Sequence, residues 1–144
     1  MNRIACVIAI CVVAGLVFGQ PPCPDQVFLP LSSAIDSSQI TVDPVSGNPL
    51  LLGVIRAIVG RPARIVGRAC DQDPNDTLTV WILPDGPSLT LDPNGVYTHT
   101  ITPTSPGATY VHVGATDGIA TRQGTWVIRA RANNPPTLCG GIVQ

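Results

Sequence analysis

The stretch Ala69-Cys70-Asp71-Gln72-Asp73-Pro74-Asn75-Asp76-Thr77-Leu78-Thr79-Val80 places a polar loop between two apolar runs. Three Asp carboxylates and an Asn amide fall within six residues, and a proline stiffens the turn. Oxygen-rich side chains at this spacing suit two structures, a site for a hard cation such as Ca²⁺ or a sharp turn closed by Asx hydrogen bonds. The apolar runs on either side of the loop predict β-strands.

The pattern around the loop is typical of an all-β domain. The run at 63–69 alternates Ile65, Gly67 and Ala69 with Arg64, Val66 and Arg68, a period of two that predicts a strand with both arginines facing water. Asn94-Gly95 favours a hairpin turn between 88–91 and 96–101, because Asn-Gly tolerates the positive φ angles of primed turns. About seven short strands, separated by turn signals every 8–12 residues or so, predict an antiparallel β-sandwich. The expected strands are 50–59, 63–69, 77–83, 88–91, 96–101, 109–115 and 125–131.

The beginning of the chain predicts secretion. Arg3 precedes an unbroken apolar run at 4–17, and cleavage is expected before Gln20. This run is short for a membrane span and no second one follows, so no membrane span is expected after signal removal. We therefore expect a secreted or cell-surface protein. The expected organisation is a signal peptide at 1–19, a Pro/Ser-rich leader with a possible edge strand at 20–48, the β-sandwich at 49–136 and a C-terminal tail at 137–144.

Composition excludes several classes of function. All eight basic residues are Arg and all nine acidic residues are Asp, so Lys and Glu are absent. With a formal net charge of −1, the chain has no overall basic field for nucleic acid or an anionic membrane. Without Lys it forms neither a Schiff base nor a P-loop, and without Glu it lacks the HExxH general base. We therefore expect a protein that is not an enzyme.

Three cysteines remain after signal removal: Cys23, Cys70 and Cys139. An oxidising compartment favours one disulfide over three unpaired thiols. In a sandwich, the segment before the first strand lies at the same end as the loop after the second strand. Cys139, by contrast, follows the Pro135-Pro136 stop at the opposite end. The expected bridge therefore joins Cys23 to Cys70.

The aromatic residues suggest packing more than ligand binding. Trp81 and Trp126 each lie in an apolar run, and a tryptophan in a sandwich strand is more often core than part of a ligand platform. Tyr97 and Tyr110 are expected at the surface, as are both histidines.

Four stretches carry a family resemblance. They are an acidic loop followed by Thr-Leu-Thr at 69–79, a central hairpin at 83–97, an Ala-x-Asp-Gly turn at 115–118 and an Asn-Asn-Pro-Pro linker at 133–136. Together they resemble the bacterial cadherin-like and dystroglycan-type cadherin-like repeats of surface proteins. That resemblance implies a Greek-key sandwich, often in tandem, with Ca²⁺ at repeat junctions. The chain departs from the pattern in having Asn where strong calcium-binding members have Asp in the linker, in lacking Glu, and in carrying one repeat only.

The candidate metal ligands are Asp71, Asp73 and Asp76, joined by Asp117 from a neighbouring turn. Ca²⁺ takes six to eight oxygens, and an extracellular-grade affinity of roughly 10⁻⁴–10⁻³ M is expected if it binds. The alternative is a solvated turn capped by Asx hydrogen bonds. The expected function is a secreted or surface-associated structural or adhesion module. The alternative is an extracellular accessory subunit that binds a protein or a glycan.

Overall fold

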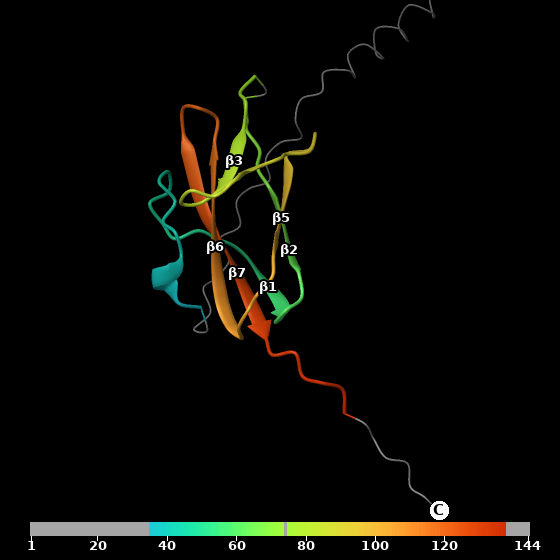
Figure 1. Cartoon of the computed structure of the whole chain (residues 1–144). Helices are drawn as coiled ribbons and strands as arrows, with labels where there is room; N and C mark the ends of the chain where they lie inside the picture. Colours follow the sequence, from blue (N-terminus) through green and yellow to red (C-terminus); the bar gives the residue numbers. More distant parts are fainter. Residues whose placement is uncertain (1–34, 74, 138–144) are drawn as a thin grey trace, which may run out of the picture.

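The computed structural model describes residues 35–73 and 75–137. Over these residues the chain forms seven strands and one short 3₁₀ helix, η1 (Ser37–Gln39), arranged as two facing sheets (Figure 1). One sheet has the order β1-β7-β6-β3-β4 and the other pairs β2 with β5. The strands are β1 (Leu51–Ile58), β2 (Ala63–Arg68), β3 (Thr79–Ile82), β4 (Ser88–Leu89), β5 (Val96–Ile101), β6 (Gly107–Thr116) and β7 (Thr121–Arg131).

The predicted all-β sandwich is confirmed, and each expected strand is present. The neighbouring strands of both sheets pair antiparallel, with the exception of β1 and β7, which pair parallel. This exception follows from the path of the chain: β1 lies at the edge of the larger sheet, and the loop at 59–62 carries the chain across to β2 in the other sheet. Within the described ranges, no helix is long and apolar enough to cross a bilayer.

The hairpin predicted around Asn94-Gly95 is only partly correct. The chain does turn there, with Gly95 at φ +74°, and the Asp92 carboxylate accepts hydrogen bonds from the backbone of Asn94 and Val96. The flanking strands, however, belong to different sheets, since β4 pairs with β3 and β5 pairs with β2. The two segments on either side of the turn pair with each other only through an isolated bridge between Leu91 and Tyr97. A turn signal of this kind fixes the reversal of the chain but not the partner of each strand.

The main core lies between the two sheets. The alternation predicted for 63–69 is present, because Ile65 is fully buried while Val66 is half exposed. Alternate residues of a strand face opposite sides, so each inner face contributes every second side chain. The buried residues of this core are Ala63, Ile65, Val80, Tyr97, Val111, Val113 and Ile128.

Aromatic rings lie directly over glycines on neighbouring strands. Trp126 is in register with Gly53, Tyr97 with Gly67, and Trp81 with Gly114. In each pair a β-carbon on the glycine would collide with the facing ring. The surface position expected for Tyr97 is therefore wrong: the residue is only 4 % exposed, because Gly67 leaves room for its ring in the core.

The two tryptophans occupy different places. Trp126 packs partly buried against the main core, and its indole Nε1–H donates a hydrogen bond to the Tyr97 hydroxyl (3.1 Å). Trp81 follows Val80, which is fully buried between the sheets, so Trp81 lies on the outer face of the larger sheet, over Gly114. The core position expected for both tryptophans is thus found for Trp126, whereas Trp81 packs on the outer face.

Residues 35–50 cover part of that outer face. Ile35 and Ile40 form a second buried cluster with Leu51 and Val127. The edge strand considered for the leader amounts, in the described part, to one bridge between Val42 and Pro49. The predicted signal peptide and the leader as far as residue 34 lie outside the described residues, as does the tail from residue 138.

An ion pair between the buried Asp43 and the partly exposed Arg122 fastens this segment to β7. The side chain of Asp43 is fully buried and accepts hydrogen bonds from Arg122 Nε (2.8 and 3.0 Å) and from the backbone N–H groups of Ser46 (3.0 Å) and Gln123 (3.1 Å). Burial opposes ionisation of Asp43, but the Arg122 and backbone donors outweigh it and hold its pKa at about 2, below the usual 3.8.

Candidate functional site

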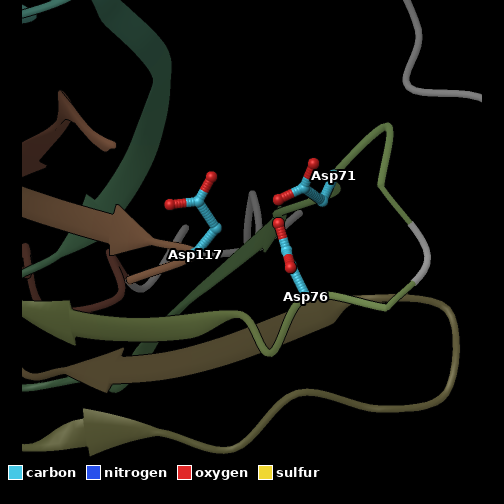
Figure 2. A group of neighbouring side chains, drawn as sticks. All are labelled: Asp71, Asp76 and Asp117. Atoms are coloured by element: carbon cyan, nitrogen blue, oxygen red, sulfur yellow. The ribbon is translucent and has the colours of Figure 1, made fainter. Parts of the chain in front are cut away.

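The acidic residues of two distant segments meet at one end of the sandwich. Asp71 and Asp76 lie in the loop between β2 and β3, and Asp117 lies in the turn between β6 and β7. Figure 2 shows these three side chains gathered at this end. One carboxylate oxygen from each lies within 4.8 Å of the others. We call this group the acidic end of the sandwich.

Local hydrogen bonds explain why the loop takes this shape. The Asp71 carboxylate accepts from the backbone N–H of Asp73 (2.9 Å), and the Asp73 carboxylate accepts from the backbone N–H of Asn75 (3.1 Å). The backbone of Asp76 then donates to the Asp73 carbonyl (3.3 Å). These are successive Asx-type turns, in which a short polar side chain takes the place of a backbone partner. They bring Asp71 and Asp76 together across the loop.

The four predicted metal ligands therefore divide into two sets. Asp71, Asp76 and Asp117 form the converging group, whereas Asp73 is not part of it. The Asp73 side chain instead caps the turn, accepting from both the backbone and the side chain of Asn75. Sequence spacing placed Asp73 near the others but did not show which way its side chain turns.

Asp117 is held by its own turn. Its Oδ1 accepts from the backbone N–H groups of Ile119 and Ala120, both at 2.7 Å. These donors lower the pKa of Asp117 from its ordinary value, since they favour the ionised form. Asp117 is therefore a carboxylate held in place by its own turn, beside the loop that carries Asp71 and Asp76.

The pKa of Asp76 is shifted in the opposite direction. Its pKa is raised, first by desolvation and then by the negative charges of Asp73, Asp71 and Asp117. Like charges at short range disfavour ionisation of one another. Since this repulsion acts when no cation is present, a bound divalent cation would relieve it.

The donor set fits a hard cation better than a soft one. Carboxylate oxygens suit Ca²⁺, Mg²⁺ and Mn²⁺, and Ca²⁺ accepts irregular geometry and completes its shell with carbonyls and water. Each of the three aspartates is only partly buried. A partly solvated site with three carboxylates is expected to be weak.

A cavity of about 710 Å³ opens beside the acidic end, between the two sheets. Asp71 and Asp117 contribute to its wall together with Cys70, and Val80 and Val113 form part of its apolar lining. Its volume falls in the range of small-molecule sites, roughly 300–1,000 Å³. The loops at this end thus frame both a carboxylate group and a concave surface.

Cys70 stands at the edge of this cavity. Every other cysteine of the chain lies outside the described residues, so the pairing with Cys23 stays a prediction.

Sequence reasoning did not identify the residues that support this end. Arg122, which holds Asp43, also lines the cavity. The two residues are 79 positions apart, and neither lies in a motif. No local pattern signals such a pair. An isolated Asp in a turn-rich leader and an isolated Arg before a strand are both ordinary surface residues by sequence.

No family model and no curated protein sequence matches this chain.

Proposed function

We propose that this chain is a secreted or surface-attached structural or adhesion module whose acidic end binds Ca²⁺ weakly. The observation that supports this most is the convergence of Asp71, Asp76 and Asp117 from two segments about forty residues apart. Residues this distant in sequence gain nothing from local turn formation by meeting, and their mutual repulsion raises the pKa of Asp76. A bound cation would offset this repulsion, which gives a physical reason for the three carboxylates to converge.

The path of the chain after β7 supports a module of the kind that is joined to other domains in tandem. β7 ends at Arg131, and the chain then leaves the sandwich at the end opposite to the acidic loops (Figure 1). The Asn-Asn-Pro-Pro stretch at 133–136 follows, which resembles the linker between cadherin-like repeats. We propose a Greek-key sandwich of this cadherin-like kind, in which β2 and β5 face the sheet formed by the other strands.

The compartment is proposed from the sequence. The apolar run after Arg3 supports a cleaved signal peptide, and the disulfide proposed for Cys70 would suit an oxidising environment. A non-enzymatic role is proposed from composition, because a chain without Lys or Glu lacks the side chains of many common catalytic devices.

A second candidate function is favoured by the cavity. A concave space of about 710 Å³ at the loop end is where an extracellular accessory subunit would hold a glycan or a peptide. A glycan array probed with the mature chain separates the two candidates. Specific retention that persists when Ca²⁺ is chelated favours the accessory subunit.

Calorimetric titration of Ca²⁺ into the mature chain tests the main proposal. We expect one site with a dissociation constant of roughly 10⁻⁴–10⁻³ M. Asp76→Asn removes a member of the converging group and should abolish the heat. Asp85→Asn makes the same charge change at an exposed position outside the group and should leave it intact. Absence of binding to the wild-type chain at millimolar Ca²⁺ would reduce the acidic end to a capped turn.

A further inference from the structure

Three arginines gather on the larger sheet, far from the acidic end. Arg56 on β1 is directly in register with Arg129 on β7, and Arg131 follows two positions along β7. Because alternate residues of a strand share a face, Arg129 and Arg131 point to the same side, and Arg56 lies beside them. All three side chains are exposed and together line a shallow depression of about 560 Å³. We call this group the arginine patch.

The charges of the arginine patch are unbalanced. Within the described residues, Arg122 forms an ion pair with Asp43, whereas the arginines of the patch form no ion pair with a carboxylate. Like charges directly opposite each other on neighbouring strands destabilise a sheet. The parallel pairing of β1 and β7 places Arg56 against Arg129 in this way. The patch therefore offers three guanidinium groups to an anionic partner.

The complementary surface is present on the same molecule but at the other end. β1 and β7 run parallel and finish together at the arginine patch, while the turn joining β6 to β7 lies at the acidic end (Figure 1). A single molecule cannot bring its two opposite ends together. Two copies can, with three carboxylates of one facing three guanidinium groups of the other.

We propose that the arginine patch docks the acidic end of a second copy of this chain, head to tail. Guanidinium groups bind carboxylates through paired N–H···O bonds, which gives the contact its geometry. The two contacting surfaces differ, so the interface is heterologous and repeats into open chains of molecules. Exposed ion pairs contribute little each, so the association is weak and sensitive to salt.

This proposal does not rest on Ca²⁺ binding. If the acidic end does bind Ca²⁺, the cation neutralises the carboxylates that the arginine patch needs, and millimolar Ca²⁺ weakens the association. If the acidic end binds no Ca²⁺, the association is unchanged by it. The two proposals therefore fail separately.

Analytical ultracentrifugation of the mature chain tests the docking. At low ionic strength and without Ca²⁺, the mean mass of the wild-type chain should rise with concentration, and about 0.5 M NaCl should return it to monomer. Arg129→Gln should weaken the association by up to about fivefold, and Arg56→Gln/Arg129→Gln should reduce it below detection. The control is Arg64→Gln, which removes the same charge from an exposed position on β2 and should change nothing.

A mixing experiment tests the head-to-tail geometry. The Arg56→Gln/Arg129→Gln variant keeps its acidic end, and an Asp71→Asn/Asp76→Asn variant keeps its arginine patch. Each alone should be monomeric, and the mixture should form one-to-one complexes. The proposal is overturned if the wild-type chain stays monomeric at low salt, if the double arginine variant associates like the wild type, or if the mixture does not associate. Binding of sulfate to the patch without self-association also overturns it and identifies a site for small anions only.

Discussion

At the scale of single residues, three glycines decide where the aromatic rings lie. Gly53, Gly67 and Gly114 each leave space beneath a ring on the neighbouring strand. Glycine normally weakens a strand, because it has no side chain to pack and loses more backbone entropy on folding. Here the facing ring covers the bare backbone, an arrangement known to offset that cost.

The Gly53–Trp126 pair gives the first prediction. Gly53→Ala should lower the free energy of unfolding by about 1–3 kcal/mol, because the added methyl group collides with the indole ring. Urea denaturation followed by tryptophan fluorescence measures this. The same change made in a Trp126→Leu background should cost clearly less, since the smaller side chain leaves room. Equal costs in the two backgrounds would show that the ring is not the cause.

Asp43 gives a prediction about acid. Its pKa of about 2 lies below the 3.8 expected for the unfolded chain, so ionised Asp43 stabilises the fold. That contribution is complete above pH 4 or so and is lost as the pH falls toward 2, by about 2 kcal/mol in total. The other aspartates titrate in the same range, so the useful measurement is a difference.

The comparison is between wild type and Asp43→Asn, by urea denaturation at several pH values. At pH 7 the variant should be the less stable protein, because it leaves Arg122 without its carboxylate. The difference in free energy of unfolding between wild type and variant should shrink as the pH is lowered from 4 toward 2. A gap that stays constant over this range would mean that Asp43 is not the titrating group.

At the scale of elements, a hydrogen bond between two side chains joins the two sheets. The Trp126 indole on β7 donates to the Tyr97 hydroxyl on β5, across the main core. Tyr97→Phe should lower the free energy of unfolding by about 1–2 kcal/mol, because it leaves a partly buried N–H without an acceptor. Chemical denaturation checks this. Tyr110→Phe, whose hydroxyl accepts from the backbone of Asp36 in a more exposed setting, is the matched control and should cost less.

The strands themselves follow from local sequence, and their partners do not. The range predicted for β5 is the one observed, and β2 shows the expected alternation. Both features depend on the alternation of side chains and on turn residues, which are properties of the local sequence. The pairing of β4 with β3, and the parallel pairing of β1 with β7, depend on which sheet each strand joins. That choice is made by packing between distant segments, which a local pattern does not encode.

For the candidate site too, local sequence predicted some features, and contacts between distant or competing groups determined the others. Clustered aspartates identified the acidic loop, and the Ala-x-Asp-Gly turn brought in Asp117. Asp73 lies outside the converging group because its carboxylate satisfies the local turn around Asn75. Short polar side chains commonly make this choice between a nearby backbone N–H and a more distant partner. Buried Tyr97 was missed because the glycine that admits it, Gly67, lies on another strand.

At the scale of the whole molecule, the sandwich carries opposite charges at its two ends. The formal net charge of −1 conceals this, since it averages the carboxylates of the acidic end with the guanidinium groups of the arginine patch. Composition alone therefore described the total field correctly but not its distribution. A cation bound at the acidic end would compete with the arginine patch of a second copy, so Ca²⁺ and salt would be the main controls of the association.

The thermal unfolding midpoint of the mature chain, measured with and without Ca²⁺, tests the central claim most directly. At Ca²⁺ concentrations about tenfold above the dissociation constant, binding should stabilise the fold by about 1.4 kcal/mol, which is a rise of several degrees. Mg²⁺ should raise the midpoint less, because it demands tighter octahedral geometry. The rise should disappear in Asp76→Asn and persist in Asp85→Asn. If the wild-type midpoint does not move with millimolar Ca²⁺, the acidic end is a hydrogen-bonded turn and binds no calcium.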